Sequence, residues 1–398
     1  MKFFLSVRPA LILAAGLIMG LSLRAAEVLV PQIRPAESEL EPVRHKQLRL
    51  GIFDVVINVA ASAVYDDNIY INRGATDGDF IFNFTPGFSA TAGGPEEKNL
   101  SLNYAPNFVF FLQQGKNNSI EHSAAINARW PITKLTLGAG ESFQSTSGSV
   151  TDVGNRVNQQ TYSTTLTAHY NWREKTSFDI NGTYNLHDYK SLIDSEDLSL
   201  ASWINYQIRP KLNLGVGLTL GYNKVQRQPS QTYEESSVRA NYIVTGKITL
   251  NASMGGQWRQ FGGGVPEQFG LVFTLGGSYL PRDGTFITIE GHRRNDNSAI
   301  LAGQNYTTTG LNLSLRQRIV DRLFTVIGGG IDEADYRSTT TRVIATRKDA
   351  YYSGRLGFEY RLSDRWQAGV FYQHRRNNSS GAFSFVDNLY GVQSSYSF

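Results

Sequence analysis

Apolar and polar residues alternate along most of this chain, and the segment from Lys211 to Tyr222 shows the pattern most clearly. Leu, Val or Tyr occupies every second position from Leu212 onward, and Asn, Gly or Thr fills the positions between. A period of two places the apolar residues on one face of a β-strand. On a helix the same residues would cover every face, so the pattern excludes a helix here.

Similar segments recur from Ile52 to the C-terminus and predict about 18 strands, each close to the roughly 9–11 residues that a tilted strand needs to cross a bilayer. The clearest of them lie at 53–65, 80–88, 100–112, 178–186, 248–258, 271–279, 311–319, 352–362 and 366–372. This repetition predicts an all-β fold: a transmembrane, antiparallel, up-and-down β-barrel that occupies residues 51–398.

The links between these segments alternate in length, as expected for short periplasmic turns and longer outer loops. Short turns are expected near Ile132, Arg173, Pro210, Gly246, Arg282, Asp321 and Asp364. Longer polar links are expected at 67–78, 146–158, 189–194, 227–231, 295–305, 337–348 and 376–383. The link at 93–99 departs from the rule, because it is long for a periplasmic turn.

Two features inside the strands refine this interpretation. Aromatic residues gather near the strand ends, as two interfacial girdles require. Those beside the short turns are Trp130, Trp172, Tyr206, Tyr360 and Trp366, and those toward the longer links are Tyr65, Tyr184, Tyr222, Trp258 and Tyr372.

Pro86 and Pro106 each remove a backbone donor from a strand, so we expect the two prolines to lie opposite each other at an irregularity in the ladder.

The last ten residues form one more alternating strand and end on Phe398. Tyr396 and Phe398 lie on its apolar face, and this ending resembles the C-terminal signal by which the barrel-assembly machinery recognises outer-membrane barrels. The alternative is a soluble sheet that happens to end in Phe. The barrel-wide repetition of the pattern favours the assembly signal.

The N-terminus has the features of an export signal. Lys2 and Arg8 precede an apolar run, Ala10 to Leu23, that is too short to span a bilayer as a helix, and Ala25 offers a small residue for cleavage. We therefore expect residues 1–25 to be a signal peptide, with a membrane anchor as the alternative. Residues 26–50 are charged and contain several prolines. They predict a flexible periplasmic arm or, alternatively, a small plug in the barrel mouth.

Composition limits the other classes of function. The formal net charge is +4, but the predicted signal peptide carries Lys2, Arg8 and Arg24 and no acid, so the mature value is 4 − 3 = +1. No nucleic-acid partner is expected at that charge. The mean hydropathy of −0.28 does not argue against a barrel, because alternating strands average out. The chain has no Cys, which excludes disulfides and thiolate metal sites.

Two short motifs carry a family resemblance. The first is Val-Tyr-Asp-Asp-Asn-Ile-Tyr at 64–70, and the second is Thr-Pro-Gly-Phe at 85–88. The chain from about residue 51 to Phe398 resembles the type 2 family of outer-membrane β-barrel porins, which includes barrels from exopolysaccharide operons. The resemblance implies an outer-membrane barrel that passes or exports saccharides. It implies no catalytic residues.

The sequence contains only weak candidates for a metal site or a catalytic site. Asp66, Asp67 and Asn68 could form a cation site with Asp77 and Asp79, but a polar loop explains the same residues. Glu290 and His292 share a strand face and could form an acid–base pair, although lumen residues would look the same. No nucleophile elbow, phosphate loop or pair of His at metal spacing is present. We therefore expect no enzyme, no metal site and no cofactor.

The face opposite the apolar one should line the lumen, and in the last third of the chain it is rich in arginine. The predicted pore-lining residues are Arg294, Arg316, Arg318, Arg355, Arg361, Arg375, Glu290 and Glu359. Consecutive strands carry them, so they should share one sector of the wall. Either the arginines give the pore a preference for anions, or they brace the wall through ion pairs.

These observations predict a pore in the bacterial outer membrane for the passive passage or export of polar solutes, with anionic saccharides as candidates. The expected partners are outer-membrane lipid, the barrel-assembly machinery and acidic saccharides. One alternative is a surface barrel whose extracellular loops bind a partner, and another is an outer-membrane hydrolase. The lack of links much longer than a dozen residues favours the pore over the loop-binding barrel.

Deletion of Phe398 should impair assembly, because the last strand serves both as the assembly signal and as the closing edge of the barrel. The measurement is the fraction of protein that folds into the outer membrane. A truncated protein that inserts as efficiently as the intact chain would contradict the assignment of the signal.

Overall fold

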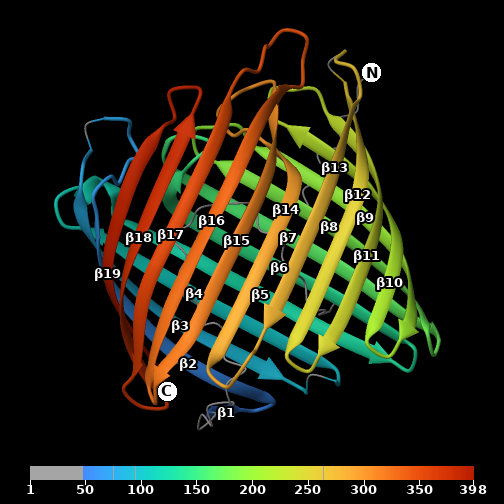
Figure 1. Cartoon of the computed structure of the whole chain (residues 1–398), viewed down its shortest axis with the longest axis horizontal. Coiled ribbons are helices and arrows are strands. Elements are labelled where there is room, and N and C mark those ends of the chain that lie inside the picture. The colour runs from blue at the N-terminus through green and yellow to red at the C-terminus, as the bar shows by residue number, and fades with distance from the viewer. Residues whose placement is uncertain (1–47, 75, 95, 263) are drawn as a thin grey trace.

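The structure is a computed structural model, and it describes residues 48–398 except 75, 95 and 263. It is a closed barrel of eighteen antiparallel strands, β2 to β19, with the short strand β1 joined to the start of β2 (Figure 1). The described residues include one 3₁₀ turn, η1 (Gly115–Asn117), and no helix long and apolar enough to span a membrane. The predicted fold class and strand number are confirmed.

The strands follow one another around the barrel in chain order. Their bounds are β1 Leu48–Leu50, β2 Phe53–Asp66, β3 Asp79–Ala92, β4 Asn99–Phe111, β5 Ser119–Ile132, β6 Leu135–Val150, β7 Asn155–Arg173, β8 Thr176–Tyr189, β9 Ser195–Arg209, β10 Leu212–Val225, β11 Gln231–Thr245, β12 Ile248–Phe261, β13 Gln268–Tyr279, β14 Thr285–Asn297, β15 Gln304–Val320, β16 Leu323–Ser338, β17 Lys348–Arg361, β18 Trp366–Ser379 and β19 Phe385–Ser397. The predicted signal peptide and all of the predicted arm except residues 48–50 lie outside the described residues.

The barrel closes where β19 pairs with β2, from Leu389↔Asp66 to Ser397↔Asn58. The Phe398 backbone N–H adds one more bond, to the Ile57 carbonyl at 2.9 Å. Closure matters because an open sheet edge in lipid would leave backbone groups without hydrogen bonds. The C-terminal residue of the chain therefore takes part in the closing seam.

The exterior is apolar and the interior is polar, as the alternation predicts. On β10, Val216 and Leu218 are 57% and 49% exposed to the surroundings of the barrel, whereas Asn223, on the other face, is 2% exposed. The girdle residues Trp130, Trp172, Trp258 and Trp366 are also on the outside, each close to half exposed. An exterior of this kind is compatible with lipid and not with water.

The two ends of the barrel differ. The end that holds β1 and the C-terminus carries the short turns, and we call it the turn end (Figure 1). The opposite end, the loop end, carries the longer links. All seven turns expected from the sequence join consecutive strands, and the link at 93–98 is long, as expected.

One predicted link was largely wrong. Instead of a loop over 146–158, β6 and β7 continue as a regular ladder as far as Val150↔Asn155 and leave only residues 151–154 between them. The side chains there are mostly small and polar on both faces, so the sequence shows no apolar alternation. Backbone pairing does not need that alternation once the strands rise above the apolar band. Links at 112–118 and 262–267 were not predicted.

The two prolines interrupt one ladder, as predicted. Pairing of β3 with β4 stops at Phe84↔Phe108 and resumes at Phe88↔Tyr104, with Pro86 and Pro106 in the gap. A side-chain bond spans it, from Thr85 Oγ1 to Asn107 Oδ1 at 2.9 Å. Neither proline can donate to the ladder, which explains the interruption.

Thiol labelling along β10 should alternate, because the chain has no native Cys and the two faces meet different solvents. In lipid bilayers, a water-soluble reagent should label Asn213→Cys and Thr219→Cys and leave Leu214→Cys, Val216→Cys and Leu218→Cys unlabelled. Labelling in detergent above the unfolding temperature controls for thiol reactivity. Uniform labelling along the strand in the bilayer would refute the assignment of its faces.

Candidate functional site

The predicted pore-lining residues all lie on strands of one wall, β14 to β18, at positions that face the lumen. Their neighbours along each strand point outward: Leu313 beside the β15 arginines is 54% exposed, and Phe358 beside Glu359 is 41% exposed, whereas Glu359 is 8% exposed. The alternation does not say which of these charges are paired, and the contacts of the arginines separate them into two groups.

Three of the arginines are held by carboxylates. Arg316 donates to Glu359 Oε2 at 3.0 and 3.2 Å, and its guanidinium lies 4.1 Å from the centre of the Phe324 ring. Arg294 donates to Asp296 at 3.0 Å, and Arg375 pairs with Asp387. Pairing and stacking fix these side chains and cancel most of their charge. They brace the wall, which was one of the two interpretations of the sequence.

The remaining three arginines have no carboxylate within ion-pair distance among the described residues: Arg318, Arg355 and Arg361. Arg355 donates to Gln373 Oε1 at 3.2 Å and covers the Phe371 ring at 3.9 Å. Arg361 lies over Phe324 at 5.2 Å. These contacts orient the two guanidinium groups without pairing them with a carboxylate.

A cavity of about 230 Å³ lies against this wall. Its polar lining includes Thr288, Glu290, Asn312, Ser314, Arg355 and Gln373. One predicted acid and one unpaired arginine thus face the same space. Hydroxyl and amide groups fill the rest of the polar lining, and such groups suit a hydrated polar solute.

The loop end of the lumen is closed by segments that fold inward. In the link from β2 to β3, Ile69 is fully buried beside Val109 and Phe111, and Ile71 packs against Tyr351 and Phe385. The inward fold of this link was not predicted, because its apolar residues form only the short run Ile69 to Ile71 in a mostly polar stretch. Their partners come from β4, β17 and β19, and the two residues anchor the link inside the barrel.

Strand β14 also leaves the wall. It pairs with β13 only from Tyr279↔Ile287 to Phe273↔Arg293, but with β15 as far as Asn297↔Asn305. Beyond Arg293 it runs inside the barrel: Asn295 Nδ2 donates to Gln257 Oε1 at 2.8 Å, and Gln257 is a buried, inward-facing residue of β12. The end of β14 therefore lies on the lumen side of β12.

Asp152, in the link from β6 to β7, connects these inward segments. It accepts from Ser298 Oγ at 3.0 Å, from the Ala299 N–H at 2.8 Å and from Tyr336 Oη at 2.7 Å. Burial raises the pKa of its carboxyl, while these donors and the charge of Arg347 act in the opposite direction. A buried carboxylate needs such partners, and here they come from three other segments.

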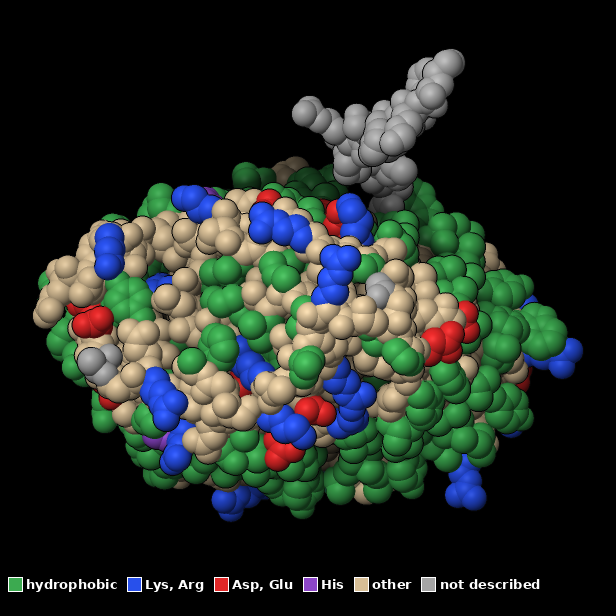
Figure 2. Space-filling model, turned by 90° about the horizontal axis from the view of Figure 1, so that it is seen from above, with side chains coloured by type: hydrophobic (Ala, Val, Ile, Leu, Met, Phe, Trp, Pro, Cys, Tyr) green, Lys and Arg blue, Asp and Glu red, His purple; other side chains and the backbone are tan. Residues whose placement is uncertain are grey.

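Arg347, in the link from β16 to β17, secures the same closure. It donates to the Asp152 carbonyl at 2.7 Å and to Asp349, and its guanidinium stacks on Phe383 at 3.7 Å. In the view onto this end, Arg and Lys and small groups of hydrophobic side chains lie scattered among the other atoms, and the surface that is not covered by grey atoms shows no wide opening (Figure 2). The described state is closed at the loop end.

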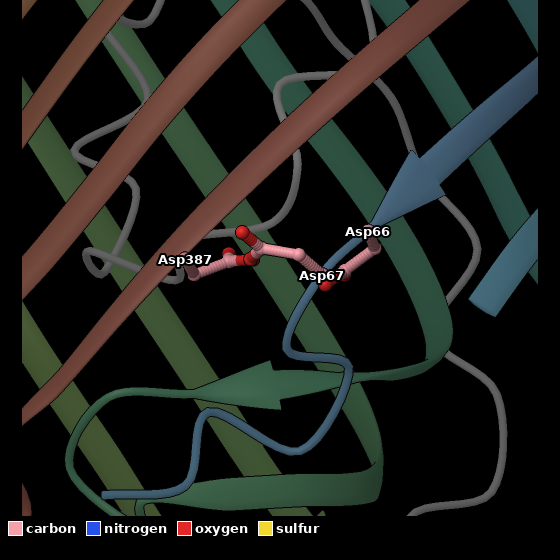
Figure 3. A group of neighbouring side chains, drawn as sticks. All are labelled: Asp66, Asp67 and Asp387. Atoms are coloured by element: carbon pink, nitrogen blue, oxygen red, sulfur yellow. The ribbon is translucent and has the colours of Figure 1, made fainter. Parts of the chain in front are cut away.

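The acidic residues Asp66, Asp67 and Asp387 converge where β2 ends beside β19 (Figure 3). Their contacts account for most of their oxygens without a cation: Asp387 pairs with Arg375, and both oxygens of Asp67 accept from Asn388 at 2.7 Å. Asp79 does not join them. It accepts from the backbone of Gln113 and Gln114 and holds the link after β4.

The other alternative chemistry also lacks a site. His292 lies 3.2 Å from Asp332 and so forms an ion pair across the strands when protonated. Glu290 lines the cavity described above. Among the described residues, the contact found for His292 is therefore with Asp332 and not with Glu290, the partner that the sequence suggested.

No family model matches the chain, and no curated protein matches it. Among solved structures, it is similar to OpdK of Pseudomonas aeruginosa, solved with vanillate, with 12% identity, a TM-score of 0.49, and coverage of 87% of this chain and 99% of OpdK. It is also similar to OpdO of the same organism (13% identity, TM-score 0.47, coverage 87% and 97%) and to OccAB3 of Acinetobacter baumannii (9% identity, TM-score 0.46, coverage 87% and 100%). Similarities this low support no conclusion about this chain.

Arg375→Ala should destabilise the barrel by about 3–5 kcal/mol, because it leaves the fully buried Asp387 without its partner. The neighbouring Arg376 provides the control, since it is exposed and donates only to Asn378. Urea unfolding in detergent, followed by tryptophan emission, measures both variants. Equal losses in the two would show that the buried pair contributes nothing particular.

Proposed function

We propose that the protein is an outer-membrane pore for polar solutes, with a preference for anions. A closed β-barrel with an apolar exterior spans a membrane, and such barrels are characteristic of bacterial outer membranes. The observation that carries the proposal is the lumen face of β14 to β18, where Glu290 and the unpaired Arg355 line one cavity. A barrel that served only as an anchor would not need uncompensated charge inside.

The preference for anions follows from the charges that remain after pairing. Arg318, Arg355 and Arg361 stay positive, while Glu290 is the only predicted pore-lining acid outside an ion pair in the described wall. The low-dielectric wall of a membrane barrel focuses this field on the lumen. Carboxylates also match the planar donors of arginine, which supports acidic saccharides as the solute class.

The two alternatives lack a comparable observation. A loop-binding barrel would present its links outward, but the links after β2, β6, β14 and β16 are engaged with one another or with the lumen. A hydrolase would need an activated nucleophile, and none is assembled around His292. Passage of solute requires the closed loop end to open, and the direction of transport is not implied by the charges.

A triple variant in which Arg318, Arg355 and Arg361 are each replaced by Gln should show reduced selectivity for anions. In planar bilayers under a salt gradient, the wild-type reversal potential should indicate anion preference, and the triple variant should move toward zero. The difference should shrink from about 0.1 M to about 1 M salt, because the Debye length falls from about 10 to about 3 Å.

Arg316→Gln together with Glu359→Gln is the matched control, because it removes a neutral pair from the same wall. Its reversal potential should stay near that of the wild type. A wild-type pore that selects cations, or a triple variant with unchanged selectivity, would contradict the role given to the unpaired arginines. A protein that never conducts, even with the loop end released, would contradict the pore itself.

A further inference from the structure

The ends of β14 and β15 form a flap, residues 294–308, that is joined to the barrel on one side only. On the β14 side the ladder with β13 stops at Phe273↔Arg293, so the flap has a free edge there. On the β15 side it stays paired with β16 as far as Gln304↔Ser338. A segment attached along one edge can rotate about that edge without breaking the rest of the barrel.

The flap reaches across the lumen. Asn295 bonds to Gln257 on β12, and Ser298 and Ala299 bond to Asp152 in the link from β6 to β7. The Ala299 carbonyl also accepts from the Ile193 N–H at 3.0 Å, in the link from β8 to β9. Asp152 and Ile193 belong to links on the far side of the barrel from β15, and Gln257 lies on β12, two strands from β14, so the flap reaches across the lumen.

Both polar and apolar contacts hold the flap. Ser298 and Ala299 bond to Asp152. Ala299 also belongs to an apolar cluster with Val153 and Val157, against which Val150, Tyr189, Leu192 and Ile300 pack. Water can replace the hydrogen bonds at small net cost, and the apolar cluster is the part that has to be exposed when the flap lifts.

The free edge begins at a fixed point. The Arg293 side chain donates to the Leu271 carbonyl at 3.1 Å and also to Thr309 Oγ1. It thereby satisfies a β13 carbonyl beside the place where the strand ladder ends, which an unpaired strand edge requires. Below Arg293, β14 stays in both ladders, so movement is confined to the residues beyond it.

We propose that the flap is a hinged lid over the lumen, with its hinge after Arg293 and its latch at Asp152. This inference rests on the proposed pore for its purpose, but its movement can be measured separately. In the closed state Asp152 binds Ser298, Ala299 and Tyr336. Release of this carboxylate removes the bonds to Ser298 and to the Ala299 N–H, and the tip is then held by the Ile193–Ala299 bond and the packing of Ala299.

A disulfide between Val153→Cys and Ala299→Cys should lock the lid, because the two side chains pack together and the chain has no other Cys. In planar bilayers, the oxidised protein should lose conductance relative to its reduced form, and dithiothreitol should restore it. The control pair is Thr183→Cys with Ser199→Cys, cross-strand neighbours on β8 and β9 that should not respond. If the Val153→Cys, Ala299→Cys variant forms its disulfide and conducts equally in the oxidised and reduced forms, the lid proposal is wrong.

A second measurement does not need conductance. Gln257→Cys lies beneath the flap, so a membrane-impermeant thiol reagent should label it slowly, and several-fold faster when Asp152→Ala is added. Ser298→Ala is a milder substitution if Asp152→Ala fails to fold. Equal labelling rates in the folded variants would overturn the latch. Faster labelling without conductance in any variant would support the lid and refute the pore.

Discussion

The structure depends first on one requirement: in lipid, each backbone N–H and C=O must find its hydrogen bond within the protein. The eighteen strands meet it by closing β19 onto β2, and the Phe398 N–H completes the seam at Ile57. Once the sheet is closed, the side chains of its strands point either outward or into the lumen. Alternation along each strand then separates an apolar exterior from a polar lumen, and every later feature of the protein lies on one of these two faces.

At the loop end, backbone groups no longer have to find all their hydrogen bonds within the sheet. There, water and side chains can satisfy backbone groups, so strands need not stay in the wall. β14 leaves β13 after Arg293, and the arginine side chain satisfies the exposed Leu271 carbonyl. The freed segment finds its partners inside the barrel, around the buried Asp152. Relaxation of the constraint at one end is thus what allows a membrane barrel to carry a lid made from its own wall.

The lumen holds its charges in two ways. Arg316 and Arg375 are neutralised by Glu359 and Asp387, which fixes the wall at the cost of desolvating both partners. Arg355 instead bonds to an amide and stacks on Phe371, which orients the guanidinium without cancelling its charge. The paired arginines thus hold strands of the wall together, and the unpaired ones are those to which the proposed preference for anions is assigned.

The sequence by itself determined the barrel, the number of strands and the apolar face of each strongly alternating strand, because a period of two is local and survives any tertiary arrangement. It also located the interruption at Pro86 and Pro106, since a missing donor is a property of the residue. It misjudged 146–158, where polar strands continue without an apolar face to reveal them. Only the tertiary structure decided which arginines are paired and that β14 turns inward. Asp152 meets Ser298, Tyr336 and Arg347 because closure brings distant links together, and no local pattern encodes that meeting.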